Sequence, residues 1–134
     1  MSVNTIIDND LLSIQEARIL AENAREAQKL LAAFPQEKLD EIVDHMAEEI
    51  GKYARELAVM SSDYGVWQDK YIKNRFVCEY LREKLRGLRC VGIIARDEAK
   101  KTIDVGVPIG VIASLCPATS PVSTTIYKVL IAIK

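Results

Sequence analysis

The sequence contains few of the residues that build metal centres, disulfide frameworks or phosphate-binding loops. It has one histidine, His45, and three cysteines that share no short metal-type spacing. It has no C-x-x-C, H-E-x-x-H, Walker or G-x-G-x-x-G motif, and no aromatic pattern of the kind that RNA-binding modules use. Because a small, odd number of cysteines suits a reducing compartment, we expect a cytoplasmic protein without a disulfide framework.

Long apolar runs and an excess of one charge are also absent. The N-terminus lacks the basic and apolar regions of a secretory signal, and glycines and prolines interrupt the apolar stretch after Val105. The 18 Lys and Arg residues nearly balance the 19 Asp and Glu residues. We therefore expect no membrane span and no nucleic-acid partner. The balance is uneven along the chain, because residues 1–64 are acidic and residues 70–89 are basic.

Helical periodicity dominates the N-terminal two thirds of the 134 residues. It predicts helices over residues 13–34, 36–50, 52–62 and 67–88. Ser13 and Glu16 have the spacing of a capping box, Pro35 separates the first two helices, and Gly87 ends the fourth. In the fourth helix the apolar stripe consists of Tyr71, Ile72, Phe76, Tyr80 and Leu81.

The pattern changes after Gly87 from helical to β-branched. Residues 90–107 contain two short β-branched runs around a polar connection, which predicts a hairpin or a nearby strand pair. Residues 109–116 form a third apolar run, which is apolar enough on both faces to predict a buried strand of a parallel sheet. Ser120 is then placed as a helix N-cap with Pro121 at the first helical position. The stripe of that last helix is Val122, Ile126, Val129, Leu130 and Ile133.

A strand, a tight turn and a helix form the first half of a βαβ unit, whose second parallel strand arrives only after the helix. An unpaired buried strand and an apolar helix would leave a large apolar surface exposed. We therefore expect a piece of a larger α/β protein. We also expect the isolated chain to associate or to dissolve poorly.

The final run, "VPIGVIASLCPATSPVSTTIYKVLIAIK", resembles the first nucleotide-binding strand and helix of the aldehyde dehydrogenase superfamily. Its pattern P-x-x-x-P-x-S-T-x-I-x-K-x-L-I-x-x-K is most similar to the CoA-acylating members, including the N-terminal half of bifunctional aldehyde-alcohol dehydrogenases. Upstream, "DKYIKNRF" followed by "VGII" resembles the same subgroup. The resemblance implies an N-terminal helical segment (1–89), a strand pair like an oligomerisation arm (90–107) and the start of a Rossmann-like NAD-binding domain (108–134).

The activity implied by the resemblance is the reversible, NAD-dependent oxidation of a small aldehyde with coenzyme A as co-substrate. A cysteine thiolate forms a thiohemiacetal in that chemistry, and the resemblance places this cysteine beyond Lys134, so that we expect the chain alone to be inactive. It also implies a homo-oligomer, in the cytoplasm or a bacterial microcompartment. The alternative, from another class, is a non-catalytic helical module for binding or oligomerisation.

The resemblance also assigns site residues. It maps contacts with the cofactor onto Leu115, Cys116, Pro117, Ala118 and Thr119. The family places an oxyanion-holding Asn just after the first proline, where this sequence has Thr119 and Ser120, each with one hydroxyl donor. Lys128 matches a family lysine near the active site, with an expected role in proton movement.

Several of these residues also have simpler interpretations. Cys116 is either a nucleophile or a buried strand cysteine. His45 is either a catalytic base or a solvated helix residue, and Ser120 could act as a cap, a catalytic donor or both. A basic cluster near a helix C-terminus either complements the helix dipole or binds phosphate, and it consists of Arg82, Lys84, Arg86 and Arg89.

Overall fold

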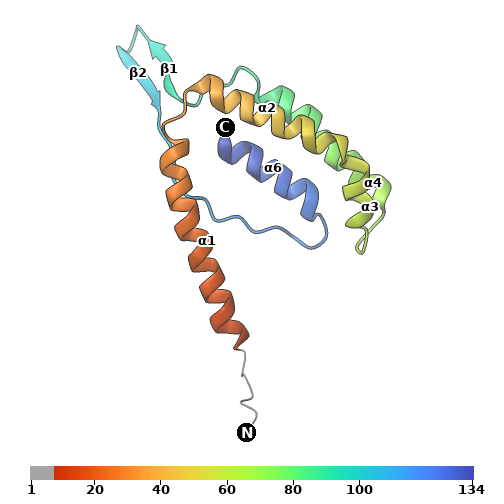
Figure 1. The fold of residues 1–134 in the computed structure, drawn as a ribbon. Helices are drawn as coiled ribbons and strands as arrows, with labels where there is room; N and C mark the ends of the chain where they lie inside the picture. Colours follow the sequence, from red (N-terminus) through yellow and green to blue (C-terminus); the bar gives the residue numbers. More distant parts are fainter. Residues whose placement is uncertain (1–7) are drawn as a thin grey trace. The chain divides into compact units, whose positions relative to one another are not determined.

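A computed structural model describes residues 8–134, which divide into two compact units (Figure 1). The first unit contains α1 (Asn9–Leu31) with residues 109–111, and the second contains residues 34–108 and 112–134. α1 begins after Asp8, whose carboxylate accepts hydrogen bonds from the amides of Asp10 and Leu11 at 3.0 Å. The predicted capping box at Ser13 is therefore wrong, since Ser13 lies inside the helix and its hydroxyl donates to the carbonyl of Asn9.

The second unit contains the remaining helices and a hairpin. The helices are α2 (Gln36–Lys52), α3 (Ala54–Met60), α4 (Trp67–Arg75), the π-helix η1 (Phe76–Leu81), α5 (Arg82–Leu85) and α6 (Pro121–Ile133). Pro35 precedes α2, as predicted. Gly87 follows α5 with a φ of 76°, a left-handed conformation that favours glycine and ends the helix as expected. No helix among residues 8–134 is both long enough and apolar enough to cross a bilayer.

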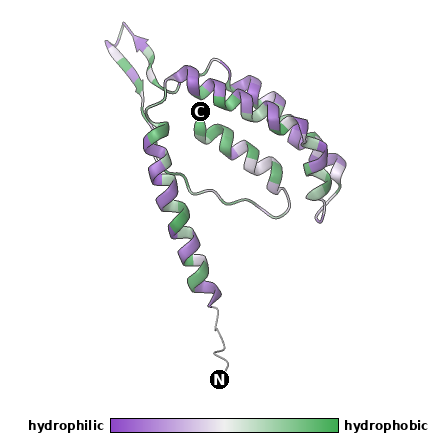
Figure 2. Ribbon diagram, viewed as in Figure 1, coloured by the Kyte–Doolittle hydropathy of each residue, from purple (hydrophilic) through white to green (hydrophobic). Residues whose placement is uncertain are grey.

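The core of the second unit lies where α6 packs against α2, α4 and η1 (Figure 1). Leu130 is 0% exposed and Ile126 5%, and they pack with Val43, Ala47, Val77, Cys78 and Leu85. Figure 2 shows how strongly hydrophobic α6 is. The expected exposure of the last helix holds only for the side with Tyr127 and Ile131, which are 45% and 42% exposed, and the apolar face predicted for α6 is buried. Helices α2 and η1 supply an apolar face that buries it.

The apolar stripe predicted for the fourth helix is wrong. Ile72, Phe76 and Tyr80 are more than half exposed, whereas the buried face carries Lys70 and Asn74. These two polar side chains are buried because backbone carbonyls of other segments accept their hydrogen bonds. Such long-range partners are invisible to a periodicity argument.

The strand pair is confirmed as an antiparallel hairpin of β1 (Gly92–Asp97) and β2 (Thr102–Gly106). Gly106 is required there, because a Cβ would overlap the carbonyl of Cys90. The predicted buried strand over residues 109–116 is wrong: the segment forms no strand, and Ile109 and Leu115 are 93% and 88% exposed. No strand in the described part of the chain pairs with it, so its backbone lacks the ladder that defines a strand.

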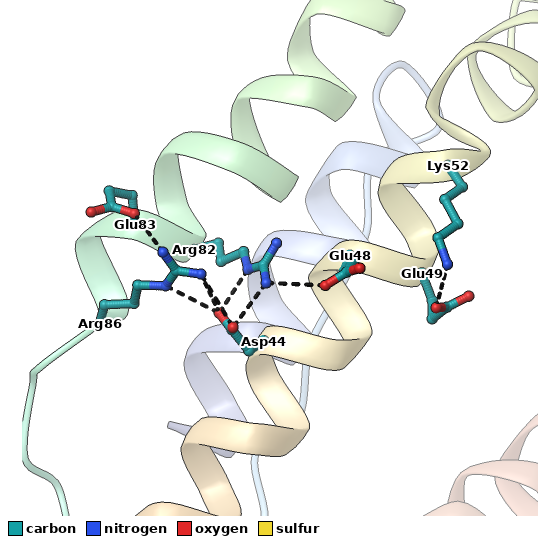
Figure 3. Close-up of polar contacts among 7 residues, drawn as sticks. All are labelled: Asp44, Glu48, Glu49, Lys52, Arg82, Glu83 and Arg86. Atoms are coloured by element: carbon teal, nitrogen blue, oxygen red, sulfur yellow. Dashed lines mark hydrogen bonds and ion pairs between the residues drawn. The ribbon is translucent and has the colours of Figure 1, made fainter.

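A charged network joins α2 to the end of the η1–α5 helix (Figure 3). The Arg82 guanidinium donates to both carboxylate oxygens of Asp44, at 2.6 and 2.8 Å, and Arg86 donates to the same carboxylate at 3.2–3.3 Å. Glu48 and Glu83 accept further bonds from the two arginines. Hydrogen bonds from Arg82 and then Arg86 lower the pKa of Asp44 far below its usual range.

Replacing the most buried large side chain of α6 tests the core. We expect Leu130→Ala to lower the free energy of unfolding by about 2–5 kcal/mol, because the change leaves a cavity in a fully buried site. Ile131→Ala, on the same helix but 42% exposed, is the matched control and should cost less than about 1 kcal/mol. Urea denaturation of both variants gives the comparison. Equal losses for the two would contradict the burial of α6 against α2 and η1.

Replacing Asp44 tests the charged network. A carboxylate with a depressed folded pKa stabilises the fold above its unfolded pKa of about 3.9, and this contribution is lost as the pH falls through the folded pKa. Asp44→Asn should therefore cost about 1 kcal/mol near neutral pH, a value limited by solvent screening, and progressively less below about pH 5. Urea denaturation at several pH values measures this, with Glu41→Gln on an exposed pair of the same helix as the control. A loss that is independent of pH would exclude the charge as its cause.

Candidate functional site

The residues expected to contact a cofactor lie in an extended, exposed segment that leads into α6. Leu115 to Thr119 are all exposed, and Ser120 precedes the helix at the N-cap position. Pro121 is the first helical residue, as predicted. Sequence continuity and the turn at Pro117–Ser120, in which the Ser120 amide donates to the carbonyl of Pro117, bring these residues together.

Two lysines from two helices bind carbonyl groups of this segment. Lys128 on α6 donates to the carbonyl of Leu115. Lys70 on α4 donates to the carbonyl of Thr119 at 2.8 Å. Lys128 therefore contacts the segment to which the resemblance assigns the cofactor contacts, while its expected role in proton movement stays a prediction, and the sequence analysis did not select Lys70. Lys70 lies within the "DKYIKNRF" motif, but only its burial, at 7% exposure, distinguishes it from the exposed Lys73 on the same helix.

The hydroxyl groups around the turn have distinct surroundings. Ser120 occupies the N-cap position, but its side chain makes no capping hydrogen bond, so its predicted role as a side-chain cap is wrong. The φ and ψ angles of Ser120, −144° and 53°, lie outside the β-region that an N-cap residue typically adopts. Thr119 and Ser120 line an open pocket of about 320 Å³ together with Tyr64, Gly65, Val66, Asp69, Lys70 and Lys73.

Cys116 does not have the surroundings expected of a catalytic nucleophile. Its sulfur lies 3.3 Å from the hydroxyl of Thr125, which in turn donates to the carbonyl of Pro121 at 2.8 Å. Among the described residues no base contacts it, so nothing there would remove its proton. The alternative, a buried strand cysteine, is also wrong, because Cys116 is exposed. Cys78 is buried, and that burial raises the pKa of its thiol.

The remaining candidate residues, His45 and the basic cluster, lie in solvent or form ion pairs within the fold. His45 is an exposed residue of α2. Arg82 and Arg86 are paired with Asp44, Glu48 and Glu83, so their charges are compensated within the protein (Figure 3). Residues 8–134 contain no group of three or more His, Cys, Asp or Glu side chains arranged to bind a metal.

The chain resembles part of several known enzymes. It is 35% identical over 126 residues to the bifunctional aldehyde-alcohol dehydrogenase AdhE of Escherichia coli (strain K12), an alignment that covers 91% of this chain and 14% of that enzyme. It is 40% identical over 113 residues to the aldehyde-alcohol dehydrogenase of Clostridium acetobutylicum, covering 82% of this chain and 13% of that enzyme. No family model matches the chain.

A solved structure agrees with these alignments. The acetylating aldehyde dehydrogenase from Geobacillus thermoglucosidasius is 38% identical and superposes with a TM-score of 0.90. The match covers 96% of this chain and 29% of that one, so the 134 residues span less than a third of the enzymes they resemble. Agreement in both sequence and backbone shows that the chain belongs to the acylating aldehyde dehydrogenases and represents one part of their fold.

Proposed function

We propose that these residues form part of an NAD-dependent, CoA-acylating aldehyde dehydrogenase that interconverts a small aldehyde, coenzyme A and NAD with an acyl-CoA and NADH. The observation that supports this is the exposed backbone of residues 115–119, held by two lysines at the entrance to α6. The resemblance maps the cofactor contacts onto this same segment.

The chemistry of the segment fits a dinucleotide. The first amides of α6 have no acceptor within the helix, and the Ser120 side chain does not cap them, so they present positive partial charge to the anionic part of a ligand. The peptide groups of the exposed residues Cys116 and Ala118, which lie between the two carbonyls that the lysines bind, can hydrogen-bond to hydroxyl or amide groups. When bound, NAD accepts a hydride from the substrate carbon. The residues of this chain would bind and orient it.

The hydroxyl of Ser120 is our first choice for the oxyanion donor in place of the family Asn, with Thr119 as the second. A hydroxyl donates one hydrogen bond and makes none to the helix here, so it is available to a developing oxyanion. Lys128 binds the carbonyl of Leu115. For this lysine we therefore favour a role in orienting the segment over one in moving protons. The nucleophilic cysteine belongs, in this proposal, to a part of the enzyme outside residues 1–134.

Sequencing the gene beyond codon 134 and expressing the product of its continuous reading frame tests the proposal. We expect it to encode a cysteine in an α/β pattern downstream of codon 134, and its product to form NADH from acetaldehyde and NAD only when coenzyme A is present. Absorbance at 340 nm measures the product. The 134-residue chain alone should form none. NADH formation by that chain, abolished by Cys116→Ser, would contradict the proposed location of the nucleophile.

Within that enzyme, Ser120→Ala should lower kcat by about 10² to 10³ with a smaller effect on KM, because one oxyanion donor is lost. Thr119→Ala is the matched control and should have a much smaller effect. A larger effect of Thr119→Ala would contradict the choice of Ser120 and identify Thr119 as the oxyanion donor.

The second candidate is an oligomerisation module, and the surface of the hairpin favours it. Four aliphatic side chains of β1 and β2 are 40–58% exposed, namely Ile93, Ile94, Ile103 and Val105. A two-stranded hairpin is marginally stable by itself, and its exposed apolar groups and free edges favour pairing with another chain. We propose that the hairpin contacts a second copy of this protein, which is compatible with the enzymatic function.

A double change in the hairpin tests the contact. Ile103→Thr with Val105→Thr keeps β-branched residues in β2 but removes apolar area, so we expect dimerisation to weaken at least about tenfold. Sedimentation velocity over a range of concentrations measures it, and Ile131→Thr, another exposed isoleucine, is the control. A wild-type protein that stays monomeric would exclude the contact.

A further inference from the structure

Lys70 is buried without an ion pair among the described residues. It is 7% exposed, and its ammonium donates to a backbone carbonyl, that of Thr119, at 2.8 Å. Lysine is almost never buried unless a partner compensates its charge, because an ammonium is costly to remove from water. Its burial at this point therefore calls for a physical explanation.

The helix that carries Lys70 is firmly placed. One turn further along α4, Asn74 is 1% exposed, and its amide donates to the carbonyl of Ala54 at the start of α3, at 3.0 Å. Arg55 of α3 also lies over the ring of Trp67, the first residue of α4, at 5.2 Å from its centroid. These contacts hold α4 against α3, so Lys70 extends from a fixed support.

The segment that Lys70 contacts has little support of its own. Residues 112–117 form no helix or strand and are exposed, so no ladder fixes the direction of their carbonyl groups. The two lysine contacts, Lys128 to Leu115 and Lys70 to Thr119, lie at either end of Cys116–Ala118. Together with the contact between the Cys116 sulfur and the Thr125 hydroxyl, they order this backbone.

The peptide unit between Thr119 and Ser120 is held from both sides. Its carbonyl accepts from Lys70 at 2.8 Å, and its amide, that of Ser120, donates to the carbonyl of Pro117 at 3.3 Å. Because a peptide unit is planar, fixing both groups also fixes the Cα of Ser120, so that only the torsion angles φ and χ1 of Ser120 remain to set the direction of its hydroxyl.

We propose that Lys70 is a positioning residue that orients the Thr119–Ser120 peptide and thereby directs the Ser120 hydroxyl toward the reacting carbonyl oxygen. The inference rests on the proposed function for its catalytic consequence, but the orientation of the peptide is a property of this chain by itself. Lys70 does not touch the substrate in this role.

The first experiment uses the 134-residue chain and needs no activity. In Lys70→Met, which keeps the length and apolar stem but removes the donor, we expect the carbonyl-carbon resonance of Thr119 and the amide resonance of Ser120 to shift. The resonances of Val43 and Ala47 in the core of α2 should remain unchanged. Lys73→Met, on the same helix but exposed, is the matched control and should leave all four unchanged. Lys70→Arg keeps a donor and should restore resonances close to those of the wild type.

Unchanged Thr119 and Ser120 resonances in Lys70→Met would overturn the inference, as would equal changes throughout α2, which would indicate a general structural role. If Lys70→Met does not fold, Lys70→Leu, which also removes the donor, provides the same comparison.

The second experiment uses the enzyme encoded by the continuous reading frame. Lys70→Met should lower kcat by about 10²-fold, the cost of misplacing a catalytic group by about 1 Å, with KM for the aldehyde changed much less. Lys70→Arg should recover most of the loss. An enzyme with no CoA-dependent turnover, but with the expected shifts in the 134-residue chain, would refute the proposed function and leave the positioning of the peptide intact. A normal kcat in Lys70→Met would refute the catalytic part of the inference.

Discussion

The second unit depends on the burial of one side of α6. Leu130 and Ile126 are removed from water by α2 and η1, and the half-buried Val122 and Ile133 pack at the edges of the same cluster. The cluster brings Val43 and Val77 together with Ile126, which lies 83 and 49 positions later in the sequence, so it determines where the chain returns after the hairpin. Burying side chains of this size contributes about 1.5–3 kcal/mol each, whereas the exposed ion pairs of the surface contribute about 1 kcal/mol or less.

Polar contacts add direction to this apolar contact. Lys134 pairs with Asp40 at the far end of α6, and Lys70 binds the carbonyl just before its start, so both ends of the helix are tied to other helices. At the start of α2, the Gln36 side-chain oxygen accepts from the amides of Cys90 and Val91, at 2.7 and 3.1 Å, which connects that helix to the base of the hairpin. Apolar burial holds α6 against α2 and η1, and the contacts of Lys134 and Lys70 fix the position of α6 along its own axis.

The sequence predicts those parts of the fold whose signal is local. Pro35, Gly87 and Pro121 mark element boundaries through their backbone chemistry, and the buried face of α6 follows from periodicity alone. The buried face of α4 could not be found in this way. Lys70 and Asn74 can be buried because they donate hydrogen bonds to the backbone carbonyls of residues 49 and 20 positions away in the sequence. The strand prediction for residues 109–116 was wrong for a related reason. An apolar composition favours a strand, but only a neighbouring strand makes one. Of the candidate site, the segment 115–120 and Lys128 were proposed from the motif and stay predictions, and Lys70 was recognised only from its burial and its hydrogen bond to Thr119.

If, as proposed, the Ser120 hydroxyl takes the place of a family Asn amide, the backbone must do more to direct the donor. An Asn side chain carries its donors on a planar group whose direction is limited by two torsion angles, and two hydrogens are available. A serine hydroxyl has one hydrogen, which rotates freely about the C–O bond. Its oxygen is displaced from the Cα by only two bonds, so its position depends on the backbone around Ser120 and on the single torsion angle χ1. In this chain the preceding peptide unit has its carbonyl bound by Lys70 and its amide bound to Pro117, while the following residue is a proline with a fixed φ angle. A short donor placed between two restrained units needs little reorganisation, which is the physical condition for stabilising a developing charge.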